Sequence, residues 1–391
     1  MPAPATPRDA VGVYLHVPFC THICPYCDFN TYRGMGSVIP RYVAAVEREV
    51  AERANLVERR QVGSVYIGGG TPSLLSPAEI ARLVNACRQR SRVEPDAEVT
   101  LEANPNGLDA ERLEGYRRAG VNRLSLGGQT LSQRGLRVLG RLHEPSDIAA
   151  AVSAARAAGF DNVSIDLIFG WPGQTLAEWR DDLDRVLGGA LGAVPEHLSL
   201  YSLIVEPGTP MADAVTRGIL VAPDDDAAAD MYELALDRLA AADWHHYEVA
   251  NWAADPTRRS QHNLLYWRNG EYLGCGAGAH GQVGGRRWMN HLAPLTYIRA
   301  VEGGQQPTSN LEEIPPPTAM GETMMLGLRL LEQGVSRAAF VARHGLSLED
   351  AFRGTVDRLA DLGMLTDDDT AVRLTRRGLL LANDVCAEFL P

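Results

Sequence analysis

Three cysteines, Cys20, Cys24 and Cys27, stand in one short loop near the start of the sequence. A structural zinc site usually has four protein ligands, and an ordinary iron-sulfur site uses four thiolates. Three thiolates leave one iron of a cluster open to a ligand from outside the protein. The spacing therefore favours an iron-sulfur cluster with one open position, and the alternatives are a three-ligand zinc site and a chance spacing.

The composition excludes several classes of function. The chain has 391 residues and a formal net charge of -12, whereas general nucleic-acid and anionic-membrane surfaces need dense cationic contacts. All 37 basic residues are arginine, which removes a Walker lysine and a lysine Schiff base from consideration. We expect no nucleic-acid partner and at most peripheral membrane contact.

The other cysteines do not form a secreted disulfide framework. Cys87, Cys275 and Cys386 lie far apart and outside any motif spacing. The N-terminal residues have no charged flank before an apolar run, and no stretch approaches the roughly 18 apolar residues of a membrane span. The sequence predicts a cytoplasmic protein in a reducing compartment.

Short apolar runs alternate with helix-like stretches from residue 11 to about 205. Such alternation builds a parallel sheet with right-handed crossovers. Six units fall short of the eight that close a complete barrel, so we predict an α/β fold, a partial (β/α)6 TIM-like barrel open on one side. The predicted strands are 11–17, 64–67, 98–102, 123–126, 163–168 and 197–203, and the predicted helices are 41–56, 76–90, 110–119, 144–158 and 176–188.

We divide the chain into residues 1–205, the partial barrel, residues 206–314, an extension that covers its open side, and residues 315–391. The segment 314–317 is predicted to be a stiff, proline-rich linker. Helices at 320–331, 336–344, 348–362 and 378–389, with a hairpin near 367–369, predict a small winged-helix-like C-terminal domain. Residues 318–391 carry eight arginines against eleven acids, a net of -3, which argues against DNA binding.

Unusual residues follow the ends of the predicted strands. Cys20 follows the first strand, the glycine-rich run 68–72 follows the second, and Glu102 ends the third. Gln129 lies just past the fourth strand, and Asp166 lies near the end of the fifth. Parallel barrels gather their sites at the C-terminal ends of the strands, so we expect these residues to share one rim.

Further motifs support the cysteine loop and span the chain from about 11 to 290. Together they resemble the radical SAM superfamily, in which the open iron binds S-adenosylmethionine (SAM). Within it they are similar to the oxygen-independent coproporphyrinogen III oxidase group, and there to the HemW-type haem chaperones. The motifs are residues 14–20, 25–29, 68–72, 102–105, 140–143, 166–173, 262–267 and 272–281.

The resemblance implies a 4Fe-4S cluster on the three cysteines and a SAM molecule beside it. Glycines let a backbone approach a ligand closely, and a guanidinium can hold a carboxylate through two parallel hydrogen bonds. Taken alone, the glycine run could equally be a plain tight turn, and each of the other implied residues could equally serve a structural hydrogen bond or ion pair. The resemblance assigns the methionine end of SAM to Gly69, Gly70 and Thr71, the ribose to Glu102, the carboxylate to Arg141, polar rim positions to Gln129 and Asp166, and aromatic contacts to Tyr14 and Tyr26.

Two functions of this group share the cluster. Oxidase members carry a further cysteine two positions after the third, where this chain has Phe29, and a longer segment ahead of the loop. These departures favour a chaperone that transfers haem to an acceptor protein over an oxidase that decarboxylates coproporphyrinogen III. A radical SAM enzyme with an unrelated substrate is a third alternative, and whether the protein is an enzyme at all stays open.

The run 262–267 resembles a motif of the haem chaperones. Imidazole is a natural ligand of haem iron, and tyrosine and tryptophan can wall the macrocycle; the alternative is a packed aromatic segment with a satisfied histidine. His280 or His291 could replace the histidine of the motif as ligand. The implied partners are a haem acceptor, for which a respiratory protein is one option, and a reductant such as flavodoxin or ferredoxin. The implied haem residues are His262, Asn263, Tyr266 and Trp267.

Overall fold

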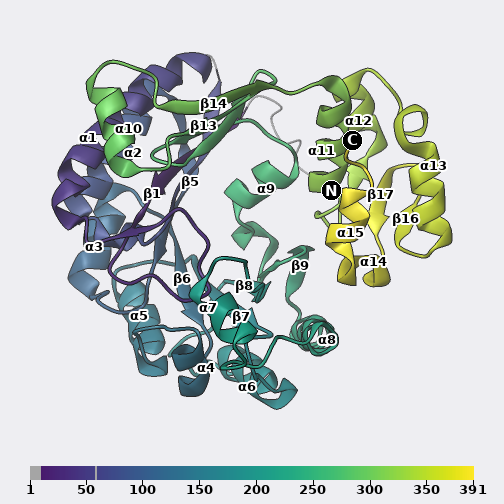
Figure 1. Ribbon diagram of the computed structural model, residues 1–391, viewed down its shortest axis with the longest axis horizontal. Coiled ribbons are helices and arrows are strands. Elements are labelled where there is room, and N and C mark those ends of the chain that lie inside the picture. The colour runs from purple at the N-terminus through teal and green to yellow at the C-terminus, as the bar shows by residue number, and fades with distance from the viewer. Residues whose placement is uncertain (1–9, 58–59) are drawn as a thin grey trace.

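The computed structural model describes residues 10–57 and 60–391 (Figure 1). Six parallel strands lie side by side in chain order, which confirms the predicted partial barrel. The strands are β1 (Val11–Val17), β4 (Gln61–Gly69), β5 (Arg92–Ala103), β6 (Arg123–Gln129), β7 (Val163–Phe169) and β8 (His197–Ser202).

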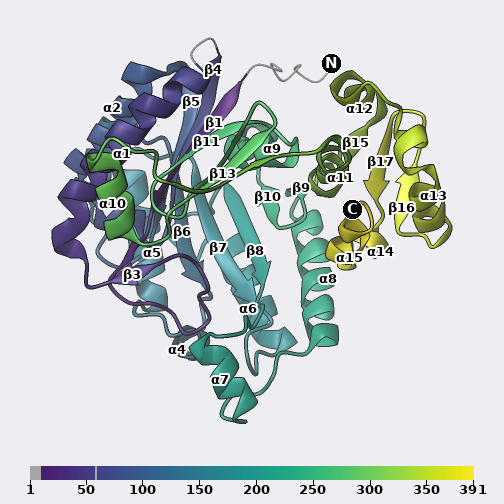
Figure 2. The same ribbon diagram turned by 45° about the horizontal axis from the view of Figure 1, so that its top comes forward.

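Helices connect these strands and cover the outer face of the sheet (Figure 2). Local sequence signals fix several helix ends. Ser76 and Glu79 form a capping box at the start of α2, and Thr175 and Glu178 form another at the start of α6. Gly120 ends α3 in the left-handed conformation, with a φ of 101°. The helices are α1 (Ile39–Arg53), α2 (Pro77–Arg90), α3 (Ala110–Ala119), α4 (Gln133–Val138), α5 (Pro145–Ala157) and α6 (Leu176–Leu187).

Side chains alternate between the two faces of each strand. On β4, Val65 and Ile67 are buried in the main hydrophobic core, while Tyr66 points to the other face and donates a hydrogen bond to Glu102 of β5 at 2.8 Å. This alternation makes the outer face apolar and the inner face polar. The polar inner side chains include Tyr14, His16, Ser64, Tyr66, Glu98, Thr100, Glu102, Arg123, Ser125, Ser164, Asp166, His197 and Ser199.

Later segments extend the sheet at both edges. Beside β1 lies the parallel strand β11 (Tyr272–Cys275), and the antiparallel strands β12 (His280–Val283), β13 (Arg286–Asn290) and β14 (Thr308–Glu313) follow. Beside β8 lie the antiparallel strands β10 (Asn251–Ala253) and β9 (His245–Glu248). In the described part of the chain the sheet has 12 strands and does not close, because β14 and β9 are not paired with each other.

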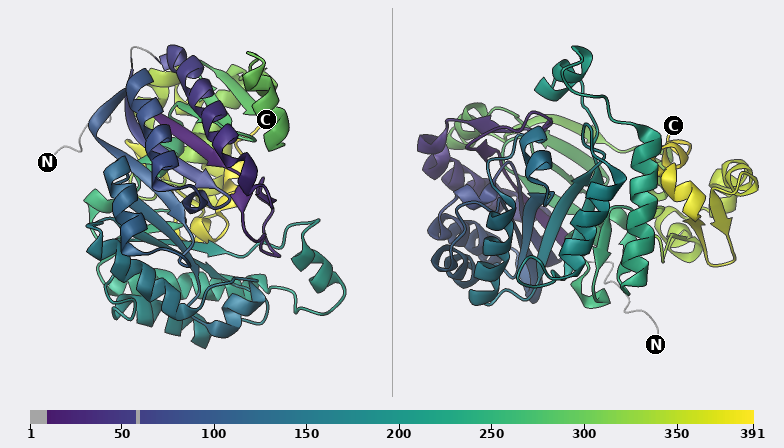
Figure 3. Two further views of the ribbon diagram at one scale, coloured as in Figure 1. Left: turned by 90° about the vertical axis from the view of Figure 1, so that its left-hand side faces the viewer. Right: turned by 90° about the horizontal axis from the view of Figure 1, so that it is seen from below.

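Four helices belong to these later segments: α7 (Pro210–Thr216), α8 (Asp225–Ala241), α9 (Gln261–Trp267) and α10 (Pro294–Glu302). Helix α7 projects from the rest of the molecule (Figure 3). Helix α9 lies at the N-terminal end of the barrel, where Glu98 accepts hydrogen bonds from the backbone N–H groups of Gln261 and His262 at 3.0 and 3.1 Å. Helix α9 therefore covers the end of the barrel opposite the cysteine loop.

The C-terminal domain lies beside α8 and α9 (Figures 1 and 2). It contains the predicted helices and hairpin, but Pro316 and Pro317 open a helix instead of forming a linker, because a first helical turn needs no proline N–H. The last predicted helix is broken at Leu381. No described helix is both long and apolar enough to cross a membrane. The elements are α11 (Pro316–Gly327), β15 (Val335–Ser336), α12 (Arg337–His344), α13 (Leu348–Asp361), β16 (Leu365–Asp367), β17 (Ala371–Leu374), α14 (Arg376–Leu380) and α15 (Ala382–Ala387).

A buried carboxylate joins the sheet extension to the first helix. The Glu49 side chain of α1 is fully buried and pairs with Arg53 at 2.7 Å. It also accepts hydrogen bonds from Asn290 and Tyr297 at 2.7 Å and from the backbone N–H of Gly276 at 2.8 Å. Glu49 thus links α1 to β13, to α10 and to the turn after β11.

Replacing Glu49 with alanine should lower the free energy of unfolding by about 3–5 kcal/mol, because Arg53 is left as a buried cation without its partner. Urea unfolding followed by circular dichroism measures this. Glu47→Ala is the matched control on the same helix, since Glu47 pairs with Arg82 at a partly exposed position and should cost no more than about 1 kcal/mol. Equal losses in the two variants would contradict the anchoring role of Glu49.

Candidate functional site

The cysteine loop lies at the C-terminal end of β1. The short parallel strands β2 (Phe19–Cys20) and β3 (Tyr32–Arg33) close its base. Cys20, Cys24 and Cys27 are half-buried free thiols. The N–H of Thr71 donates to the carbonyl of Phe19 at 2.9 Å, which holds the loop against the end of β4.

Glycine is required where the end of β4 passes the loop. Gly69 has a φ of 121°, a conformation that residues with side chains rarely adopt. A Cβ atom at Gly70 would lie 2.8 Å from the carbonyl oxygen of Phe19 and 2.9 Å from the sulfur of Cys20. These two glycines therefore let the backbone run close to the thiols.

The three thiols suit a cluster better than a single ion. Thr71 Oγ1 donates to the sulfur of Cys20 at 3.4 Å, and Arg141 Nη1 lies 3.5 Å from the sulfur of Cys24. Among the described residues, no three His, Cys, Asp or Glu side chains are grouped as a site for one metal ion. In a cluster each thiolate binds a different iron, so the sulfurs stand farther apart than around one zinc ion.

Arg141 reaches the loop from the segment after α4. Its Nη2 atom donates to Asn104 Oδ1 at 2.5 Å and to the carbonyl of Gly127 at 3.1 Å. A Cβ atom on the preceding Gly140 would lie 2.3 Å from Pro25 Cδ, so this turn packs directly on the cysteine loop. The contacts fix a cation beside the thiols.

Glu102, at the end of β5, accepts two hydrogen bonds inside the barrel. The Tyr66 hydroxyl donates to Oε1 at 2.8 Å, and the N–H of Gly69 donates to Oε2 at 2.9 Å. Burial raises the pKa of Glu102 to about 7, although both hydrogen bonds oppose the rise. The carboxyl therefore titrates near neutral pH and keeps lone pairs for a further donor.

Asp166 and Gln129 complete the polar rim on the neighbouring strands. Both carboxylate oxygens of Asp166 accept from the Ser125 hydroxyl, at 3.1 and 3.2 Å, and burial raises the pKa of Asp166. Gln129 has a φ of 67°, and the pairing of β6 with β7 shifts register between Leu126 and Gln129. This irregularity places Gln129 among the residues of the rim.

These groups surround one cavity of about 530 Å³. The structure brings all but one of the predicted cluster and SAM residues to its wall. Tyr14 is the exception, because its hydroxyl bonds to His16 Nδ1 at 2.9 Å within the barrel. The predicted residues that line the cavity are Cys20, Cys24, Tyr26, Cys27, Gly69, Gly70, Thr71, Glu102, Gln129, Arg141 and Asp166.

Sequence reasoning did not assign roles to Asn104 and Ser125, which also line the cavity. Asn104 bridges Thr71 and Arg141, since its Nδ2 donates to Thr71 Oγ1 at 3.3 Å and its Oδ1 accepts from the arginine. Every second residue of β5 points into the barrel, so the position two residues after Glu102 identifies Asn104 as a further candidate. The same period along β6 would have identified Ser125.

The run predicted to bind haem lies on α9, and its residues do not converge on one cavity. The His262 side chain is only 1% exposed, and its Nδ1 lies 2.8 Å from Ser64 Oγ. Its ring stacks on Tyr66 at 5.1 Å and meets the edge of Tyr266 at 4.6 Å. Burial lowers the pKa of His262 to about 3, so the imidazole is neutral and faces the barrel interior.

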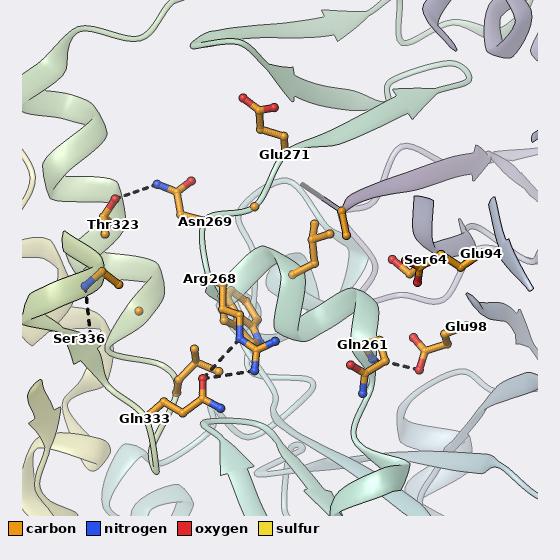
Figure 4. Close-up of a pocket in the computed structure, with 18 of the residues that line it drawn as sticks. Ser64, Glu94, Glu98, Gln261, Arg268, Asn269, Glu271, Thr323, Gln333 and Ser336 are labelled. Atoms are coloured by element: carbon orange, nitrogen blue, oxygen red, sulfur yellow. Dashed lines mark hydrogen bonds between the residues drawn. The ribbon is translucent and has the colours of Figure 1, made fainter. Parts of the chain in front are cut away.

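A second cavity, of about 1070 Å³, separates α9 from the C-terminal domain (Figure 4). Of the four predicted haem residues only Trp267 lines it, while Asn263 and Tyr266 are half-buried elsewhere on α9. His280 and His291, the alternative ligands, do not line it. We name this cavity the interdomain cleft.

The raised pKa of Glu102 makes stability depend on pH. The folded-state pKa of about 7 lies above the ordinary value of 4.5, so the unfolded chain loses this proton first and stability falls as pH rises between these values. Replacing Glu102 with glutamine removes that loss. Relative to wild type, Glu102→Gln should gain about 2.5 kcal/mol between pH 5 and pH 8, measured by urea unfolding of protein free of metal and nucleotide. A difference that does not change with pH would contradict the raised pKa.

Two family models match the chain: the radical SAM superfamily over residues 14–186, and the HemN C-terminal domain over residues 314–381. Heme chaperone HemW of Bacillus subtilis is 38% identical over 380 residues, covering 97% of this chain and 99% of that protein. Heme chaperone HemW of Mycobacterium tuberculosis is 41% identical over 387 residues, covering 98% and 96%.

Among solved structures, the coproporphyrinogen III oxidase HemN of Escherichia coli matches with a TM-score of 0.83 and 24% identity, covering 98% of this chain and 90% of that chain. At this identity the likeness concerns the fold. The full-length sequence matches are closer, and they agree with the three-thiol loop and the cavity around it. The chain belongs to the HemW family of the radical SAM superfamily.

Proposed function

We propose that this protein is a haem chaperone that carries a 4Fe-4S cluster and SAM and transfers haem to an acceptor protein. The observation that carries the proposal is the similarity, over nearly the whole chain, to relatives named heme chaperone. The three free thiols of one loop support the cluster. The family resemblance and the wall of the 530 Å³ cavity support SAM.

Cys20, Cys24 and Cys27 would hold the cluster, which when bound supplies an electron of low potential for SAM cleavage. The protein's own contribution is position and charge. Arg141, held by Asn104, keeps a cation beside Cys24, where it can also pair with a carboxylate.

The segment 69–71 can offer a ligand its backbone carbonyl groups but not its N–H groups. Its three backbone N–H groups already donate within the protein, to Glu102, to the carbonyl of Val17 and to the carbonyl of Phe19. The segment therefore presents carbonyl oxygens rather than N–H groups, and carbonyls suit the ammonium group of a bound methionine. Glu102 would accept hydrogen bonds from ribose hydroxyls through its remaining lone pairs, while Gln129, Asp166 and Tyr26 complete the wall.

For haem, we propose that the α9 motif acts through its outer face. Trp267 lines the interdomain cleft, whereas His262 holds α9 to the barrel through Ser64 and Tyr66. Ligation of haem iron by His262 requires α9 to leave the barrel end. Asn263 and Tyr266 would support the helix from its half-buried faces.

The competing function is oxidative decarboxylation of coproporphyrinogen III, because the chain shares its fold with that oxidase. Phe29, at the position where oxidase members carry a further cysteine, is 67% exposed and lies at the cavity. A phenyl ring cannot supply a thiolate. This difference favours the chaperone.

The proposed partners are a haem acceptor and a one-electron reductant. Exposed apolar side chains, Phe29, Leu142 and Ile204, surround the mouth of the 530 Å³ cavity, with exposed fractions of 67, 65 and 62%. They offer contact area to a protein that docks near the cluster. We place these events in a reducing compartment such as the cytoplasm, because all six cysteines are free.

Anaerobic reconstitution tests the proposal. The wild-type chain should take up iron and sulfide, bind haem stoichiometrically, and give no vinyl-bearing product from coproporphyrinogen with SAM and reductant. Cys24→Ala should lose the brown iron-sulfur absorption because one of three ligands is gone. Absorption spectroscopy and product chromatography measure these results.

The matched control is Cys386→Ala, which removes a buried thiol of the C-terminal domain and should keep the absorption. A retained cluster in Cys24→Ala would mean that the ligands are wrongly assigned. A vinyl-bearing product would replace the chaperone with the oxidase.

A further inference from the structure

The interdomain cleft is bounded by two parts of the chain that are distant in sequence. Figure 4 shows Arg268, Asn269 and Glu271 on the segment after α9, with Thr323 and Ser336 of the C-terminal domain facing them. The two sides touch at several points, such as Asn269 Nδ2 on Thr323 Oγ1 at 3.1 Å and the packing of Trp267 against the cluster that contains Leu330. At about 1070 Å³ the space is large enough for a cofactor-sized molecule.

Among the described residues, two arginines of the cleft wall form no ion pair with a carboxylate. Arg268 donates to the amide oxygen of Gln333, at 3.3 and 3.4 Å. Arg343 of α12 donates to the backbone carbonyls of Asn269 and Arg268, at 2.6 and 3.3 Å. Within the described residues neither guanidinium forms an ion pair. Arg268 directly follows α9, and Arg343 of α12 contacts the backbone of the same turn. Burial and the nearby Arg259 lower the pKa of Arg268, so this cation lacks a compensating charge.

Five acids also line the cleft, Glu94, Asp96, Glu98, Asp161 and Glu271, and the charges of Glu271 and of the nearby Glu322 act on Arg343. Among the described residues none of these acids forms an ion pair with Arg268 or Arg343. Glu98 is used by the N-terminus of α9, Glu271 pairs with Arg60, and Asp161 pairs with Arg258. Arg259, which also reaches the C-terminal domain, is matched with Glu332 at 2.8 Å.

Apolar side chains stand next to the two arginines. Trp267, Leu265, Leu330 and Phe340 line the same cleft. The indole N–H of Trp267 is buried without a hydrogen-bond partner, and the guanidinium of Arg329 covers its ring at 4.4 Å. A ligand for this site needs a broad apolar body and negative groups at one end.

We propose that the interdomain cleft binds haem by its propionates, with Arg268 and Arg343 as the carboxylate-binding residues and Trp267 beside the macrocycle. The two propionates leave one edge of the ring side by side, and the two arginines meet at the turn after α9, where Arg343 donates to the carbonyls of Arg268 and Asn269. This inference rests on the proposed haem-chaperone function and assigns the ligand's binding site within it.

The lining has a consequence for the iron. Among the described residues that line the cleft there is no His, Cys, Met or Tyr. The cleft would therefore hold haem through its propionate carboxylates and through packing against the macrocycle, without a protein ligand to the iron. The iron then stays open to a ligand from the acceptor protein, which suits transfer.

The test compares haem with its dimethyl ester, whose propionates carry no charge, by absorbance titration of the full chain. Arg268→Gln should weaken haem binding about tenfold, because one charge-assisted hydrogen bond is lost, and should leave ester binding unchanged. Arg343→Lys, which keeps the charge but not the planar fork, should weaken haem binding less. The control is Arg358→Gln, since Arg358 pairs with Glu388 on the exposed face of the C-terminal domain at 2.7 Å, and it should bind haem as wild type does.

Unchanged haem binding in Arg268→Gln, or an equal loss for haem and ester, would overturn the propionate site and leave the chaperone function standing. Failure of the wild-type chain to bind haem at all would overturn both.

Discussion

The polar inner face of the parallel sheet is the constraint on which the rest of the structure depends. The helices pack on the apolar outer face of the sheet. Because successive side chains of a strand point to opposite faces, every second residue of each strand points into the barrel. These inner residues are charged or hydroxylated, and buried polar groups must find partners. Many find them across strands, as Tyr66 does with Glu102 and Ser164 does with His197 at 2.8 Å. Thr100 Oγ1 and Arg123 Nε have no hydrogen-bond partner among the described residues. The interior is therefore a network of hydrogen bonds that fixes the side chains at both of its ends.

Each end of that network faces a different cavity. At the C-terminal end of the strands, Glu102 and Asp166 face the cysteine loop. At the N-terminal end, Glu98 caps α9. Between them one chain of contacts runs from Glu102 through Tyr66 to the stacked ring of His262. These contacts through the barrel thus connect the proposed SAM site to the helix beside the interdomain cleft.

The sequence predicted the parallel strands and most of the rim, because period-two patterns and motif positions locate the strand ends directly. It could not predict that Tyr14 bonds to His16 behind the cavity. An inward side chain reaches the rim only if its residue lies close to the C-terminal end of the strand. Nor could the run 262–267 reveal which face of α9 turns inward. That depends on Ser64, Tyr66 and Glu98, which are distant in sequence. The prolines at 316 and 317 are compatible with a linker and with a first helical turn, and packing of the C-terminal domain decided between them.

In the proposed site three thiolates hold a cluster whose fourth iron is open to SAM. Electron paramagnetic resonance of the reduced, reconstituted protein, recorded with and without SAM, shows whether SAM binds that iron. We expect the signal of a reduced 4Fe-4S cluster that changes when SAM is added, because the new ligand binds one iron. A signal that SAM leaves unaltered would mean that SAM does not bind the cluster.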